Sequence, residues 1–183
     1  MTFYKLKQTL LCLLILLVLL PACSSQSVLL RPSSSLKQLG DTVRLSLSGE
    51  QIEPAVLEQL QREIKAQLIL AGFEPTKTDA SRLNLNVIVT AFNPGNAALR
   101  MTVGFGAGRG SLLYQANYSG EDGKILAKLD GEERFTGLEL DYNQHYGLTT
   151  TMGGAETATM VLIKEAAKHI VELAINPVPQ DDR

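Results

Sequence analysis

The sequence contains no tryptophan and only two cysteines, Cys12 and Cys23. Cys12 lies in an apolar run that we expect to be removed, so the mature chain would keep a single thiol. A single thiol excludes an internal disulfide framework, a thiolate zinc site and a redox dithiol. The two histidines, His145 and His169, lack the spacing that places two ligands on one helix face. We therefore expect no metal site and no cofactor.

Positive charge is also not in excess. The chain has 17 lysines and arginines against 19 acidic residues, which gives a net charge of −2. Binding to nucleic acid requires a basic face that neutralises phosphates, and binding to an anionic membrane surface requires a polybasic patch. We therefore expect no nucleic-acid partner, and any attachment to a membrane has to come from another feature.

No apolar run is long enough to span a bilayer, which takes roughly 20 residues. The run from Leu10 to Leu20 is shorter and follows Lys5 and Lys7. A short positive segment followed by a short apolar run is typical of a cleavable signal peptide.

The end of this run, Leu20-Pro21-Ala22-Cys23, resembles the lipobox of bacterial lipoproteins, although Pro21 stands where a small or hydroxyl residue is commoner. The resemblance implies cleavage between Ala22 and Cys23, and lipid on the Cys23 sulfur. A covalent lipid would then attach the chain to a membrane. Ser24 favours the outer membrane in a Gram-negative organism, facing the periplasm, and in other bacteria the site is the outer face of the cytoplasmic membrane. The alternative is an uncleaved anchor with an incidental cysteine.

The chain divides into four segments. We expect a lipoprotein signal peptide over residues 1–22, a lipidated cysteine with a flexible serine-rich tether over 23–41, one folded domain over 42–175, and a disordered tail over 176–183.

The pattern of the folded domain predicts an α+β fold, a mainly antiparallel sheet with two helices packed on one face. Period-two alternation predicts strands, and apolar residues three and four apart predict helices. The helices are expected at about 54–71 and 155–175, and the strands at 42–48, 83–89, 111–119 and 125–129, the last extending towards Phe135. A further apolar alternation covers 99–105, and the strand–helix–strand start allows one parallel pair.

A glycine-rich passage, residues 104–110, lacks the spacing of a dinucleotide or phosphate loop. We interpret it as a close passage between strands, with anion binding by Arg109 as the alternative. The run Gly104-Phe105-Gly106-Ala107-Gly108-Arg109, followed by a strand and Asp122-Gly123-Lys124, resembles the bacterial lipoprotein family called domain of unknown function 4410. The resemblance covers residues 42–175 and implies a periplasm-facing lipoprotein with no assigned activity.

Polar clusters offer no catalytic set. Asp141, Tyr142, His145 and Tyr146 lie in a segment without periodicity, which we interpret as a polar loop with a possible role as a partner or ligand surface. His169 is expected at the edge of a helix face. The Glu132-Glu133 pair is expected to be solvated near a strand end.

Three functions remain open. The first is a non-enzymatic envelope lipoprotein, an accessory or scaffold that docks to an envelope protein. The second is a module that binds a small ligand or glycan through the 136–154 loop and the 104–110 passage. The third is a hydrolase that acts on the cell wall, but we cannot identify a nucleophile for it in the sequence.

Overall fold

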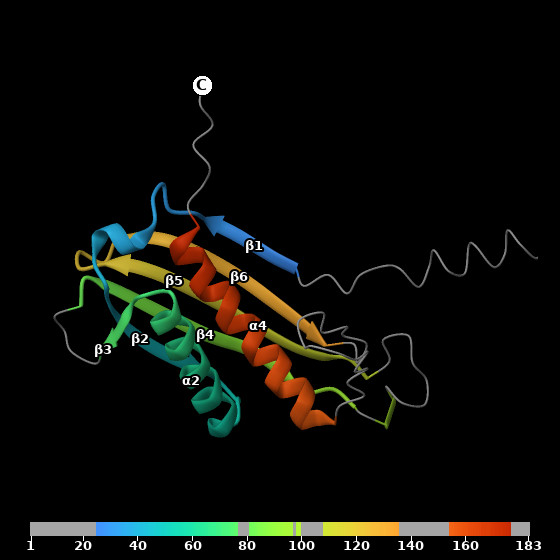
Figure 1. Cartoon of the computed structure of the whole chain (residues 1–183). Coiled ribbons are helices and arrows are strands. Elements are labelled where there is room, and N and C mark those ends of the chain that lie inside the picture. The colour runs from blue at the N-terminus through green and yellow to red at the C-terminus, as the bar shows by residue number, and fades with distance from the viewer. Residues whose placement is uncertain (1–24, 77–80, 97, 100–107, 136–153, 177–183) are drawn as a thin grey trace, which may run out of the picture.

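The computed structural model describes residues 25–76, 81–96, 98–99, 108–135 and 154–176. These residues form one six-stranded sheet with two long helices on one of its faces, which confirms the expected α+β class (Figure 1). The elements follow the chain as β1 (Ser25–Leu30), the 3-10 helix η1 (Leu36–Leu39), β2 (Thr42–Gly49), α2 (Pro54–Leu70), β3 (Glu74–Thr76), β4 (Leu83–Asn93), β5 (Gly110–Gly120), β6 (Ile125–Phe135) and α4 (Ala155–Ile175).

The strand order is β1-β6-β5-β4-β2-β3. The pairs β1/β6, β6/β5 and β5/β4 are antiparallel, whereas β2 runs parallel to both β4 and β3. The β5–β6 hairpin turns at Gly123, whose φ of 75° suits glycine, as its Asp-Gly sequence predicts. The sheet is thus mainly antiparallel, and the strand–helix–strand start gives the parallel part.

Each helix begins and ends close to its expected bounds. Pro54 occupies the first turn of α2, where its missing N–H costs nothing. After α2, Gly72 takes a φ of 81°, and the Phe73 N–H donates to the Leu68 carbonyl over 2.8 Å. This arrangement satisfies carbonyls that the helix end leaves free, and Phe73 packs back into the core.

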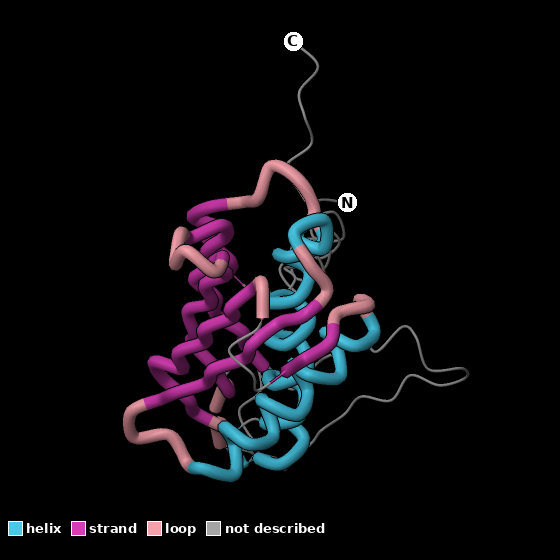
Figure 2. The backbone as a smooth tube through the Cα atoms, turned by 90° about the vertical axis from the view of Figure 1, so that its left-hand side faces the viewer, coloured by secondary structure: helices cyan, strands magenta, loops and turns pink. Residues whose placement is uncertain are grey.

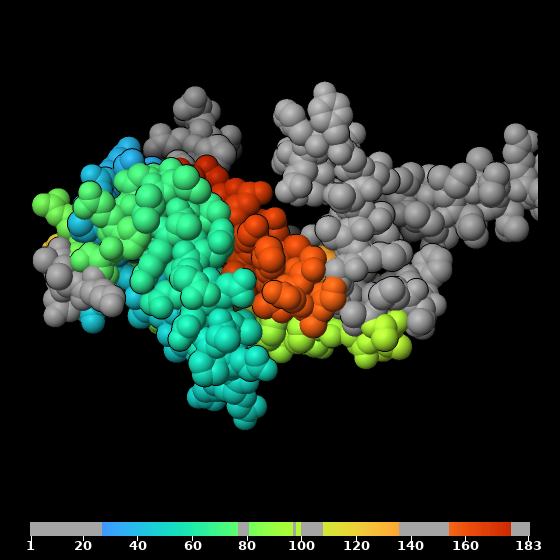
Figure 3. All heavy atoms as spheres, turned by 60° about the horizontal axis from the view of Figure 1, so that its bottom comes forward, coloured from blue at the N-terminus to red at the C-terminus, as the bar shows by residue number. Residues whose placement is uncertain are grey.

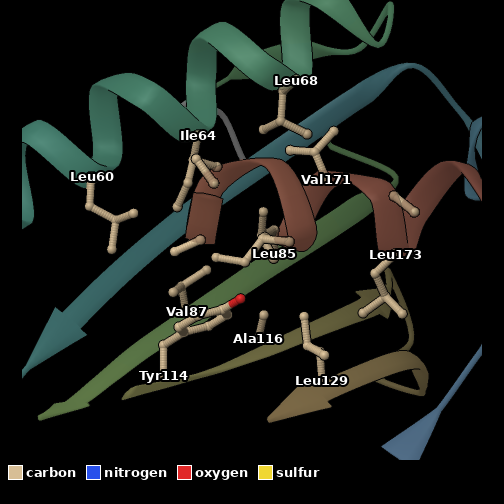
Figure 4. Close-up of a cluster of buried hydrophobic side chains, with 14 of the residues drawn as sticks. Leu60, Ile64, Leu68, Leu85, Val87, Tyr114, Ala116, Leu129, Val171 and Leu173 are labelled. Carbon is tan, nitrogen blue, oxygen red and sulfur yellow. The ribbon is translucent and has the colours of Figure 1, made fainter. Parts of the chain in front are cut away.

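The two helices cover the same face of the sheet and lie side by side (Figure 2). Their apolar stripes, with Leu60 and Ile64 from α2 and Val171 from α4, meet the inward residues of the strands (Figure 4). In the space-filling view the surfaces of α2 and α4 adjoin (Figure 3). The core therefore lies between one helical layer and one sheet.

The expected flexible tether over 23–41 is wrong for the part that the structure describes. Residues Ser25–Leu30 form β1, which pairs with the edge of β6, and Leu36 in η1 is buried. The reason is non-local, because β6 offers an unpaired backbone edge and Val28 packs against the core. Little chain is left to serve as a spacer before the fold begins.

β1 begins at one end of the sheet, and α4 ends at the opposite end (Figure 1). Ser25, the start of β1, lies opposite Glu132 near the end of β6, whereas α4 ends beside the other end of the sheet (Figure 1). Segments 1–22 and 177–183 lie outside the described residues, as does most of the 99–105 alternation. Within the described part, no helix is both long and apolar enough to cross a membrane.

Candidate functional site

A buried polar cluster joins the sheet to α4. Glu133 on β6 is 2% exposed, and its Oε1 accepts a hydrogen bond of 2.9 Å from the Tyr114 hydroxyl of β5. The same oxygen lies 2.9 Å from His169 Nδ1 of α4. One carboxylate oxygen therefore connects two strands and a helix.

The alternation of β6 explains why a carboxylate lies inside. Leu129, Gly131, Glu133 and Phe135 share the helix-covered face, and Glu132 points the other way, where it pairs with Arg134 at 2.8 Å. The expectation that both glutamates are solvated is thus correct for Glu132 and wrong for Glu133. Successive side chains of a strand point to opposite faces, so only one of the two adjacent residues can face solvent.

Gly131 makes room for the cluster. It lies directly opposite Tyr114 in the strand register, and a β carbon at this position would overlap the Tyr114 ring. The missing side chain lets the ring lie across β6 and bring its hydroxyl to Glu133, two residues further along the strand.

The electrostatics of the cluster favour an ion pair. The hydrogen bond to Glu133 raises the pKa of His169, against the opposing effect of partial burial, and the nearby charges of Glu165 and Glu172 raise it further. Burial, followed by the Glu133 charge, raises the pKa of Tyr114 above its ordinary value, so its hydroxyl remains a donor. A protonated His169 would donate a hydrogen bond to Glu133 Oε1.

A second tyrosine strengthens the same junction. Tyr118 of β5 is fully buried, and its hydroxyl donates to the Ile170 carbonyl of α4 over 3.2 Å. Burial raises the pKa of Tyr118, which keeps this donor protonated. Together with the Glu133 cluster, it fixes how α4 lies on the sheet.

His169 also borders a small cavity of about 90 Å³ between β1, β6 and α4. Arg31, Glu172 and Asn176 supply its other polar lining, and Val28 and Leu129 are among its apolar walls. Pockets for small-molecule ligands are usually about 300–1,000 Å³, so this space suits a few waters better than a sugar or cofactor.

A larger, shallower groove of about 300 Å³ separates the C-terminal turns of α2 and α4. Its lining includes the apolar Leu70, Val171 and Ile175 and the charged Lys168 and Glu172. Leu70 is 79% exposed, so the groove is open rather than enclosed. Among the described residues no group of three or more histidine, cysteine, aspartate or glutamate side chains is arranged to hold a metal ion.

The residues that the sequence singled out as a possible surface are not brought together here. Arg109 is described and is exposed beside the start of β5. Asp141, Tyr142, His145 and Tyr146 lie outside the described residues, as do Ala22 and Cys23. The Tyr114–Glu133–His169 cluster was not expected as a unit, although the alternation that extends β6 to Phe135 was the signal for an inward Glu133.

The described glycines of the 104–110 passage fit the expected close approach. Gly108 has a φ of 68°, and its carbonyl accepts a hydrogen bond of 3.0 Å from the Asn96 N–H. A β carbon at Gly108 would overlap the Asn96 carbonyl. The absence of a side chain at Gly108 therefore allows the chain at Asn96 to approach this closely.

Comparison with known proteins places the chain in a family. The model of the family described as domain of unknown function (DUF4410) matches residues 34–136. Among proteins with curated functions, none matches significantly.

Solved structures of similar fold include PelC from Paraburkholderia phytofirmans, described as a dodecamer. It is 14% identical with a TM-score of 0.50, over 84% of this chain and 99% of that one. A DUF4136 family protein from Bacteroides thetaiotaomicron is 10% identical with a TM-score of 0.47, over 84% and 98% of the two chains. At these identities the likeness concerns the fold alone.

Proposed function

Since the chain belongs to the family described as domain of unknown function (DUF4410), whose description assigns no activity, we propose a function from the chain's own features. It is a non-enzymatic envelope lipoprotein, anchored through lipid on Cys23, which holds its folded body at a membrane surface and docks to a protein partner there. In a Gram-negative cell the surface is the periplasmic face of the outer membrane.

One observation carries the proposal. Cys23, at the end of the lipobox-like sequence, stands two residues before Ser25, where β1 begins. A lipid at this position attaches directly to an edge of the sheet, so the membrane fixes which part of the body is nearest to it. Acyl chains stabilise such an anchor by about 0.8 kcal/mol for each buried CH₂.

The described polar cluster has a structural role. Glu133 is 2% exposed and uses one oxygen for both Tyr114 and His169, so its bonds hold α4 on the sheet. The neighbouring cavity, about 90 Å³, is small for a substrate. PelC, which shares the fold, is described as a dodecamer, which favours a role in protein assembly for this chain as well.

Metabolic labelling with a clickable fatty acid tests the anchor. We expect label on the wild type, none on Cys23→Ala, and full label on Cys12→Ala, which removes the other cysteine of the sequence. Membrane fractionation should follow the same order. Equal labelling of wild type and Cys23→Ala would overturn the lipoprotein assignment.

Partner docking needs a separate measurement. Pull-down of the full-length protein from membranes, with and without a crosslinker, should recover a partner in stoichiometric amount. If no partner is recovered and envelope glycans raise the melting temperature, the protein is instead a glycan-binding module.

A further inference from the structure

The composition of β1 does not match its position in the sheet. Edge strands expose unpaired backbone groups, and proteins usually protect them with charges, proline, β-bulges or very short length. β1 is an edge strand, yet Ser25–Leu30 contains neither a charged residue nor a proline. In this sheet the other uncharged strands, β4 and β5, are both interior.

At the opposite edge of the sheet the outermost strand is β3, which covers β2 from Thr42 to Arg44. β3 is only three residues long and contains Glu74 and Pro75. Proline has no N–H to donate to a neighbouring strand. Head-to-tail pairing of β1 with β3 of another molecule would therefore form few hydrogen bonds.

We propose that the edge of β1 that no described strand covers pairs with β1 of a second copy of this chain, antiparallel and about a two-fold axis, so that one sheet continues through both copies. The register with β6 is regular from Ser25 to Val28 and shifts between Val28 and Leu30. The regular part forms the centre of the interface, and the irregularity limits its length.

Two observations favour a second copy as the occupant. A strand that meets its own copy places like residues near each other, which is unfavourable for charged strands and harmless for the uncharged β1. In addition, and resting on the proposed lipid at Cys23, all copies would be held in one membrane with β1 at the same height. Confinement raises the effective concentration at which a short interface can form.

Symmetry restricts the possible registers. Directly opposite residues of antiparallel strands point to the same face, so a symmetric pair places one residue of β1 opposite its own copy. If the axis passes through Ser27, the two Ser27 residues lie directly opposite each other. If it passes through Gln26 or Val28, they lie on a diagonal. In either case their β carbons are about 4.5–8 Å apart. Ser27 is exposed and lies across from Asp130 of its own β6.

Cysteine crosslinking in native membranes tests the pairing. Starting from the full chain with Cys12→Ala, each of Gln26, Ser27 and Val28 is changed to cysteine in turn. Opposite Cα atoms in antiparallel strands are about 4.5–5.5 Å apart, within the range of a disulfide. We expect mild oxidation to give a disulfide-linked dimer that peaks at one of these positions.

The matched controls are the Cys12→Ala parent, which shows any linkage through Cys23, and Thr90→Cys, an exposed position on the interior strand β4. Dimer yields in the β1 variants that do not exceed those of Thr90→Cys would overturn the proposal. Fatty-acid labelling of the same samples reports the anchor independently, so failure of the pairing and failure of the lipoprotein assignment can be distinguished.

A charge-swap experiment gives a second readout. Ser27→Lys should leave each copy folded, because Asp130 Oδ1 is buried without a hydrogen-bond partner among the described residues and would gain one. It should also convert the detergent-solubilised dimer into a monomer, because like charges would meet across the interface. Ser27→Asp should do the same, and its circular dichroism spectrum must show that the fold tolerates a second carboxylate opposite Asp130. Coexpression of the two variants should restore a mixed dimer. Monomers in the wild type, or dimers that persist in both single variants, would contradict the proposed interface.

Discussion

Tyr114 lies across Gly131, its direct neighbour on β6, and its hydroxyl reaches Glu133 beyond. Gly131→Ala should therefore destabilise the protein, because the added methyl group overlaps the ring. Overpacking of this kind costs about 1–3 kcal/mol, measurable by urea unfolding of residues 24–183.

The matched control for Gly131→Ala is the same substitution in a Tyr114→Leu background. Removing the ring removes the overlap, so the alanine should then cost much less, which gives a coupling energy between the two sites. Equal costs in both backgrounds would show that the ring does not depend on the glycine.

The adjacent glutamates Glu132 and Glu133 should respond differently to the same substitution. Glu133→Gln replaces a buried carboxyl oxygen that bonds to both His169 and Tyr114, and should lower the free energy of unfolding by about 1–3 kcal/mol. Glu132→Gln weakens an exposed pair with Arg134 and should change stability little. Similar losses for both would mean that β6 has a different register.

Stability should decrease as the pH rises through the raised pKa of His169. A group whose pKa is higher in the folded than in the unfolded state stabilises the fold fully below its unfolded pKa, about 6.5 for histidine, and loses that contribution above its folded pKa. Urea unfolding at pH 6 and pH 9 should show this decrease in the wild type.

In His169→Gln the decrease should be smaller, since glutamine can donate to Glu133 but does not titrate. His145 is present in both proteins and provides the internal control. An unchanged pH dependence in the variant would mean that the ion pair contributes nothing to stability.

The buried face of α2 gives a prediction about packing. Leu60 is fully buried, and Leu60→Ala should cost about 2–5 kcal/mol. Gln61, one position further and only partly buried, should change the free energy of unfolding by less than about 0.5 kcal/mol when replaced by alanine. Similar unfolding midpoints for the two variants would mean that another face of α2 is buried.

Much of the fold could be predicted because its signals are local. The apolar spacing from Val56 to Leu68, with Pro54 before it and Gly72 after it, indicates the helix that the structure contains at Pro54–Leu70. The second helix, Ala155–Ile175, ends before Asn176-Pro177 as the sequence indicates. Alternation likewise predicted four of the strands, since period two is visible within each segment.

β1 and the polar cluster could not be predicted in the same way. Ser25–Leu30 has weak alternation and is a strand because β6 leaves an edge free for it, which depends on the whole sheet. Glu133 and His169 are 36 positions apart and meet only once α4 lies on β6. Their contact therefore depends on packing rather than on any local pattern.

Only one residue separates Cys23 from β1, and this limits the distance between a lipid on Cys23 and the folded body. Consecutive Cα atoms are 3.8 Å apart, so Ser25 can lie no more than about 8 Å from the Cα atom of a lipidated Cys23. If Cys23 carries lipid as proposed, a body held this closely would not reach across the periplasm to a distant target. Such a body would move by lateral diffusion with its lipid, and a protein that it binds would have to come close to the membrane.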